Sequence, residues 1–91
     1  MDSETTESTR LRVTMYTTSW CGSCRTAKRF FQEQGVDYEE IDIEEVPEAA
    51  EKVMSWARGY KTVPTMVIGD AIVVDWDRRA VAAALSEAGL A

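Results

Sequence analysis

The two cysteines of this chain are separated by two residues and stand where a predicted strand ends and a predicted helix begins. Residues 11–17 (LRVTMYT) alternate β-branched and aromatic residues with polar ones, which predicts a strand. Apolar residues then recur at helical spacing between Cys24 and Gln34, and Gly35 follows as a helix stop. A strand, a Cys-Gly-Ser-Cys loop and a helix therefore begin the fold.

The next segment completes a strand-helix-strand unit. Residues 37–43 alternate again, with Tyr38, Ile41 and Ile43 as the apolar members, and predict a second strand. Because a helix connects the two strands, we expect them to be parallel neighbours with a right-handed crossover.

Two further helices are expected. Pro47 suits a first helical turn, and the apolar residues among positions 46–57 share one face of a helix that ends at Gly59. Asp77 can cap the last helix, which ends at Gly89.

A hairpin lies between these helices. Residues 65–68 (TMVI) and 71–74 (AIVV) flank a Gly-Asp pair, which predicts two antiparallel strands. The order β-α-β-α-β-β-α predicts an α/β fold with a four-stranded mixed sheet flanked by three helices. No repeat or linker interrupts it, so we expect residues 10–91 to form one domain.

Residues 1–9 (MDSETTEST) are polar and acidic, and we expect them to form a flexible tail. They contain no apolar run, so they match neither a signal peptide nor a transmembrane segment. These features predict a cytoplasmic protein.

Composition excludes several classes of site. The chain has no histidine, which excludes serine-histidine-aspartate triads, HExxH metalloproteases and histidine zinc ligands. Two cysteines cannot supply the four ligands of a zinc or iron-sulfur site within one chain. With a net charge of -6, the chain lacks the excess of positive charge that attracts nucleic acid or an anionic membrane. We therefore expect no metal, nucleic acid or membrane partner.

The position of the cysteine pair predicts redox chemistry. Cys21 lies among the free N–H groups at the positive end of a helix dipole, where cysteine pKa values fall to roughly 3.5–7.5. It is therefore the expected nucleophile, and Cys24, one helical turn further in, is the expected resolving thiol. Half of a zinc site, a structural disulfide and two unrelated core cysteines are the alternatives.

Two stretches resemble the glutaredoxin branch of the thioredoxin-like fold: residues 17–24 (TTSWCGSC) after the first strand, and residues 62–65 (TVPT) before the hairpin. Residues 16–24, 36–44 (VDYEEIDIE) and 47–50 (PEAA) are more particularly similar to mycoredoxins, the glutaredoxin-like proteins of actinobacteria. This resemblance implies a thiol-disulfide oxidoreductase that reduces mixed disulfides between clients and a low-molecular-weight thiol.

The resemblance also implies a cis peptide bond at Val63-Pro64 that presents the Val63 backbone to an incoming thiol or peptide. An ordinary trans proline at the start of a strand is the alternative. The residues expected to contact substrates are Trp20, Gly22, Ser23, Thr62, Val63, Pro64, Trp76 and Asp77. For three of them a structural role is the competing interpretation: shielding of the sulfur for Trp20, cover for the last helix for Trp76, and a helix cap for Asp77.

Departures from the family pattern bear on the identity of the small thiol. A glycine pair that holds a carboxylate of glutathione in the family is Val74-Asp75 here, and a frequent basic residue is Thr18. Mycothiol lacks the carboxylates of glutathione, so these losses favour mycothiol as the co-substrate. No bound cofactor is expected.

Charge is unevenly distributed along the chain. Eight of the sixteen acidic residues lie between Asp37 and Glu51. Cationic residues flank the predicted site at Arg25, Lys28, Arg29 and Lys61. They predict a basic rim around Cys21, with an ordinary solvated helix face as the alternative.

Two other functions compete with this one. The first is a redoxin reduced directly by a flavin-dependent thioredoxin reductase, although the loop VDWD at 74–77 differs from the Trp-Ser-Gly-Phe that such redoxins resemble. The second is an iron-sulfur carrier dimer, whose members most often resemble Cys-Gly-Phe-Ser. The expected partners are oxidised or S-thiolated client proteins and a small thiol, and we expect a monomer.

Overall fold

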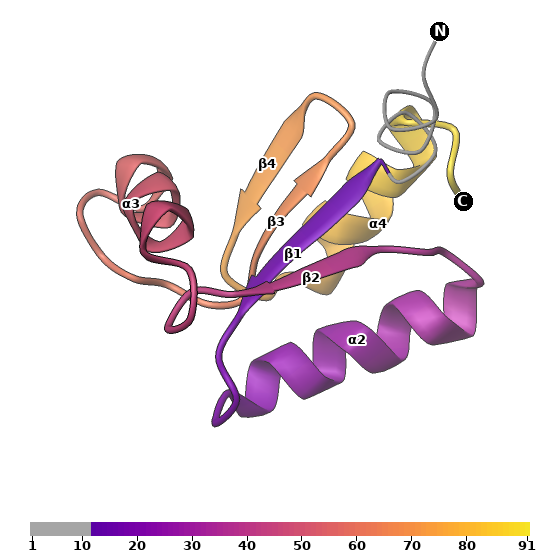
Figure 1. Cartoon of the computed structure of the whole chain (residues 1–91). Coiled ribbons are helices and arrows are strands. Elements are labelled where there is room, and N and C mark those ends of the chain that lie inside the picture. Colours follow the sequence, from indigo (N-terminus) through magenta and orange to yellow (C-terminus); the bar gives the residue numbers. More distant parts are fainter. Residues whose placement is uncertain (1–11) are drawn as a thin grey trace, which may run out of the picture.

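Residues 12–91 are the part of the chain that this computed structural model describes, and they contain four strands and three helices (Figure 1). In chain order these are β1 (Val13–Thr17), α2 (Gly22–Gln34), β2 (Glu39–Asp42), α3 (Pro47–Trp56), β3 (Thr65–Ile68), β4 (Ala71–Val74) and α4 (Arg78–Glu87). This succession confirms the predicted order of elements. The predicted tail, residues 1–9, lies outside the described residues.

The four strands form one mixed sheet in the order β2-β1-β3-β4. β1 is parallel to β2, with Tyr16 opposite Ile41, and antiparallel to β3, with Met15 opposite Met66. β4 pairs with β3 in the predicted hairpin. Because β1 is a central strand, the cysteine loop that follows it leaves from the middle of the sheet.

Helices cover both faces of the sheet (Figure 1). Successive residues of a strand point to opposite faces, so Met15 lies in the core under α2 and α4, whereas Tyr16 lies in the core under α3. Phe31 and Leu85 fill the first core, and Val53 fills the second. The cysteine loop is therefore anchored between two packed layers.

Helix α2 begins two residues earlier than predicted, at Gly22 instead of Cys24. Cys21 has an extended backbone, and its sulfur accepts the Cys24 N–H at 3.0 Å, which makes Cys21 the N-cap. At the other end, Gly35 has a φ of 69° and ends the helix as predicted.

Strand β2 is shorter than the predicted 37–43. The chain turns at Asp42, whose carbonyl oxygen accepts the N–H groups of Glu45 and Val46. The side chain of Asp42 also accepts the Glu44 N–H at 2.8 Å. This turn brings the acidic segment after β2 back toward the cysteines.

Helix α3 ends at Trp56 rather than at Gly59. Arg58 and Gly59 both have positive φ angles, 58° and 89°, a conformation that cannot continue an α-helix. Trp56 is partly buried and packs edge-on against Tyr16 of the core, with ring centroids 5.7 Å apart. Within residues 12–91, no helix combines the length and apolarity needed to cross a membrane.

Candidate active site

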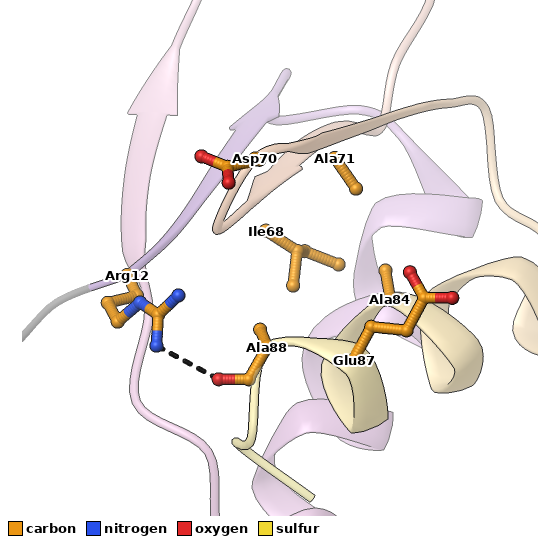
Figure 2. A pocket seen from close by; sticks show the side chains of 7 residues that line it. All are labelled: Arg12, Ile68, Asp70, Ala71, Ala84, Glu87 and Ala88. Carbon is orange, nitrogen blue, oxygen red and sulfur yellow. Dashed lines mark hydrogen bonds between the residues drawn. The ribbon is translucent and has the colours of Figure 1, made fainter.

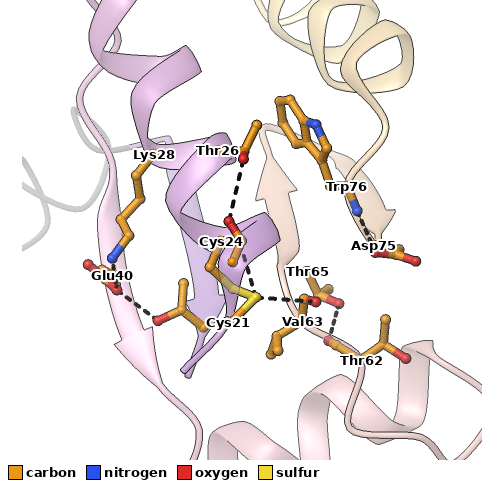
Figure 3. The surroundings of a disulfide bond; sticks show 12 residues. Cys21, Cys24, Thr26, Lys28, Glu40, Thr62, Val63, Thr65, Asp75 and Trp76 are labelled. Carbon is orange, nitrogen blue, oxygen red and sulfur yellow. Dashed lines mark hydrogen bonds and ion pairs between the residues drawn. A yellow bond between two sulfur atoms is a disulfide. The ribbon is translucent and has the colours of Figure 1, made fainter. Parts of the chain in front are cut away.

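Cys21 and Cys24 form a disulfide at the start of α2, with Cα atoms 5.2 Å apart (Figure 3). Cys21 retains 7% of its surface exposed, whereas Cys24 is fully buried. Cys21 is therefore the cysteine of the pair that an incoming molecule can reach.

Two backbone groups approach the Cys21 sulfur. The Cys24 N–H donates to it at 3.0 Å, and the Val63 carbonyl oxygen lies 3.7 Å away. An N–H in the first turn of a helix stabilises negative charge on the atom that it faces. A reduced sulfur at this position would therefore be stabilised as a thiolate, and as a thiol it could donate to the Val63 carbonyl.

The loop before β3 faces the disulfide (Figure 3). Its Val63-Pro64 peptide bond is cis, which confirms the expectation that rested on the sequence resemblance. The Thr65 hydroxyl donates to the Thr62 carbonyl at 2.8 Å, and both Pro64 and Thr65 are buried. These contacts fix the Val63 backbone next to the sulfur.

The residues beside and between the cysteines are exposed. Trp20 is 67% exposed, and its Nε1–H donates to a carboxylate oxygen of Glu44 at 3.2 Å. Gly22 and Ser23 are also exposed. The hydrogen bond to Glu44 attaches Trp20 to the segment after β2, while most of the indole ring remains in solvent.

The start of α4 carries two aspartates whose carboxylates are bonded to backbone N–H groups. Asp77 accepts the Ala80 N–H at 3.1 Å, so it is the predicted helix cap. Asp75 has a φ of 73° and accepts the Trp76 N–H at 2.7 Å. Trp76 packs edge-on against Phe30 of α2, with ring centroids 5.7 Å apart.

A polar cluster joins β1, β2 and α2 beside the disulfide. Glu40 accepts hydrogen bonds from Thr17 at 2.8 Å and from Lys28 at 2.9 Å. Partial burial raises the pKa of Glu40, but these hydrogen bonds and the Lys28 charge outweigh burial, and the pKa lies below its ordinary value. Tyr16 precedes Thr17 on β1. Its pKa is raised by burial and, to a lesser extent, by the charge of Glu39.

Two of the four cations of the predicted basic rim have carboxylates in their surroundings, whereas Arg25 and Arg29 are exposed on α2. Lys28 forms a salt bridge with Glu40, and Lys61 lines a groove together with Glu44 and Glu51. The turn at Asp42 places the acidic segment among these cations, which the linear charge pattern did not show.

Two of the three cavities described here flank the disulfide region. A groove of about 510 Å³ lies between Trp20 and α3. A smaller cavity of about 240 Å³ lies between α2 and the start of α4, with Phe30 and Trp76 in its lining. The described residues contain no cluster of three or more cysteine, histidine or acidic residues that could hold a metal ion.

The third cavity, of about 290 Å³, lies at the opposite end of the sheet (Figure 2). Arg12, Asp70 and Glu87 are among its lining residues. Arg12 donates to the Ala88 carbonyl at 2.9 Å and so satisfies the C-terminal end of α4. This cavity is far from the cysteines, and its arginine has a structural role.

The sequence alone did not identify Glu40 and Glu44 as site residues. Glu40 binds Lys28, 12 positions earlier in the chain. Glu44 binds Trp20, 24 positions earlier. The acidic run itself was visible, but only the turn at Asp42 decides which of its residues face the site. The spacing of Ala50, Glu51 and Met54 on one helical face was the available signal for the groove.

Known proteins are similar to this chain in sequence and in fold. The sequence profile of the glutaredoxin family matches residues 13–73. The chain belongs to the glutaredoxin family. It is 38% identical to the glutaredoxin-like protein NrdH of Escherichia coli over 60 residues, which cover 66% of this chain and 72% of that protein. It is 45% identical to a glutaredoxin-related protein of Mycobacterium tuberculosis over 58 residues, which cover 64% of this chain and 69% of the relative.

Solved glutaredoxin structures superpose on most of the chain. The NrdH-redoxin of Escherichia coli has a TM-score of 0.70 and 32% identity, covering 80% of this chain and 93% of that one. The glutaredoxin of Archaeoglobus fulgidus has a TM-score of 0.72 and 30% identity, covering 82% and 86%. These relatives confirm the thioredoxin-like glutaredoxin fold.

Membership of the glutaredoxin family assigns the general activity. The protein is a thiol-disulfide oxidoreductase with a disulfide-forming Cys-Gly-Ser-Cys sequence. Glutaredoxins use glutathione-like thiols as co-substrates and need no bound cofactor. Their substrates are thiols and the disulfides of client molecules.

Proposed function

We propose that this glutaredoxin reduces mixed disulfides between client molecules and a low-molecular-weight thiol, with mycothiol favoured over glutathione, and that Cys21 is the nucleophile. The observation that supports this role is the Cys24 N–H, which points at the Cys21 sulfur from 3.0 Å at the N-terminus of α2. It stabilises the thiolate, the reactive form of cysteine. Cys24 is fully buried and therefore acts second, as the resolving thiol.

The reaction proceeds by two exchanges. The Cys21 thiolate attacks the small-thiol sulfur of the mixed disulfide, and the client leaves as a thiolate that takes up a proton. The small thiol is now bound to Cys21 by a disulfide. In one route, a second small thiol attacks the sulfur of the first, so that a symmetrical disulfide of the small thiol leaves and the Cys21 thiolate is regenerated. In the other route, Cys24 attacks the Cys21 sulfur, releases the small thiol and forms the disulfide of this structure.

The loop and the exposed residues around Cys21 are the proposed substrate contacts. The backbone of Thr62, Val63 and Pro64 borders the sulfur and can pair with an extended thiol or peptide. Gly22 and Ser23 are exposed between the two cysteines. We place Trp20 on the client side and Trp76 with Asp77 on the small-thiol side.

The start of α4 supports the preference for mycothiol. The carboxylates of Asp75 and Asp77 already accept the N–H groups of Trp76 and Ala80. A carboxylate of glutathione directed at the N–H groups of Trp76 and Ala80 would lie beside two negative charges and would find these donors occupied. Thr18, where a basic residue is frequent, is neutral and buried. Mycothiol carries no carboxylate and avoids this repulsion.

The test is stopped-flow tryptophan fluorescence of the oxidised protein. It is mixed separately with mycothiol, with glutathione, and with a thioredoxin reductase plus NADPH. We expect mycothiol to open the disulfide at least about tenfold faster than glutathione, the factor that 1.4 kcal/mol of differential binding produces. Faster reduction by glutathione would refute the preference.

Direct reduction by thioredoxin reductase is the second candidate function. The relationship to NrdH supports it, since a solved NrdH-redoxin of this fold is described as having a thioredoxin-like activity profile. The same stopped-flow experiment separates the two candidates. Reduction by the reductase alone, with no response to mycothiol, would replace the small thiol by a protein donor.

A further inference from the structure

The groove between Trp20 and α3 is lined by the residue that directly precedes Cys21. Its volume is about 510 Å³. The Trp20 ring and Met54 provide apolar surface, while Glu44, Glu51 and Lys61 provide charge. The mechanism proposed above uses none of the charged residues in this groove.

The charged side chains that line the groove form no ion pair with one another among the described residues. Within residues 12–91 the single salt bridge is Lys28–Glu40, so neither Glu44 nor Glu51 lies within ion-pair distance of Lys61. Glu44 uses one carboxylate oxygen for Trp20. Two carboxylates against one ammonium group give the groove a net negative charge.

One buried polar atom of the lining lacks a partner. Thr18 is 5% exposed. Among the described residues, its hydroxyl oxygen is the one buried side-chain nitrogen or oxygen atom without a hydrogen-bond partner. A buried hydroxyl without a partner is unfavourable. Thr18 also lines this groove.

We propose that the groove binds a lysine or arginine side chain of the client polypeptide, close to the client cysteine that leaves when Cys21 attacks its disulfide. This proposal rests on the proposed function and adds the class of client. The aliphatic part of a long cationic side chain packs against Trp20 and Met54 while its charged end reaches Glu51. Backbone groups of the same segment lie near Thr18.

The test compares three synthetic peptides, each with one internal disulfide, that differ only in the residue beside one half-cystine: lysine, norleucine or glutamate. Reduced protein is mixed with each peptide at low ionic strength, and the peptide thiols formed are measured. The protein reacts once, and we expect its second-order rate constant to be about three- to fivefold higher for lysine than for norleucine, as for a partly exposed ion pair, and lowest for glutamate. In Glu51→Gln the preference for lysine over norleucine should fall below about twofold.

Glu48→Gln is the matched control, because Glu48 is an exposed residue of the same helix that does not line the groove. It should keep the preference. Equal rates for the lysine and norleucine peptides, or an undiminished preference in Glu51→Gln, would overturn the proposal.

Two further measurements separate this proposal from the proposed function. Reduction of hydroxyethyl disulfide, which is small and uncharged, tests the thiol chemistry alone. Binding is followed by NMR on the oxidised protein with the same peptides carrying serine for cysteine. The Trp20 indole N–H and Met54 methyl signals should shift at about threefold lower concentration of the lysine peptide than of the norleucine peptide. Equal titrations would overturn the proposal even if hydroxyethyl disulfide is reduced.

Discussion

On the α3 side of the disulfide, the groove beside Trp20 is lined by two glutamates and one lysine. On the α4 side, the cavity beside Trp76 is lined by Arg29, Arg78 and one glutamate, and Arg78 lies over the Phe30 ring, 5.3 Å from its centroid. The two halves of a mixed disulfide therefore meet cavities with different linings and different volumes. With the proposed assignments, the client lies toward α3 and the small thiol toward α4.

The two sides share one sulfur, and its removal should have the largest effect. Cys21→Ser should lower reduction of mixed disulfides at least about 1,000-fold, because Cys24, the other cysteine of the chain, is fully buried. Cys24→Ser should stay within about threefold of the natural protein when a small thiol is present, since that thiol can resolve the intermediate. Turnover of a mixed-disulfide peptide with excess mycothiol measures both, and equal losses would contradict the route that uses Cys21 alone.

Changing Asp75 should make the α4 side more tolerant of glutathione. Asp75→Asn removes the negative charge and keeps a residue that accepts positive φ, so glutathione-dependent reduction should rise about tenfold while the mycothiol rate changes less than twofold. Asp70→Asn, in the hairpin turn at the other end of the sheet, makes the same charge change and should alter neither rate. Stopped-flow rates with the two thiols decide this, and an unchanged glutathione rate would show that Asp75 is not the barrier.

Trp20→Ala should act on the α3 side alone. Removing the ring takes apolar surface from the groove, so reduction of the lysine-containing peptide disulfide should fall about five- to tenfold. Reduction of hydroxyethyl disulfide should change less than about twofold. Tyr60→Ala is the control, because Tyr60 is similarly exposed, at 72%, and lines none of the described cavities. Equal losses with both disulfides would place Trp20 in the general chemistry rather than in client binding.

Lys28→Met should have the smallest effect, and on stability rather than on recognition. The pKa of Glu40 is lowered in the folded state, so its contribution to stability is present above the ordinary value of 4.5 and is lost as pH falls below it. Both side chains are partly exposed, so the loss at pH 7 should be less than about 1 kcal/mol. The free energy of unfolding is measured in urea at pH 7 and at pH 3.5. The difference between the two values should be smaller for Lys28→Met than for Lys52→Met, which changes an exposed cation of α3. The same difference in both variants would contradict the role of this ion pair.

Local patterns were sufficient to predict the elements and their order. The Gly69-Asp70 turn, Pro47 at the first turn of α3 and the Asp77 cap all act through neighbouring residues, and all three are present. The cis bond at Pro64 rested on the family resemblance, since spacing alone does not distinguish cis from trans.

The charge environment of the site could not be predicted in the same way. Which acidic residue reaches Trp20 or Lys28 depends on the turn at Asp42 and on the pairing of β1 with β2. Linear proximity suggested a basic rim, whereas the folded chain pairs one lysine and surrounds another with glutamates. Long-range electrostatics therefore required the three-dimensional structure.

The disulfide spans a single turn at the start of α2, between the helix cap and the third helical residue. The large side chains that hold the sheet to its helices lie elsewhere, around Phe31 and Leu85 on one face and Val53 on the other. Both cores therefore lie outside the turn that this bond closes, and we expect them to stay in place when it opens. The protein can cycle between its oxidised and reduced forms as an almost rigid carrier of electron pairs, with the same surface offered to its partners at each encounter.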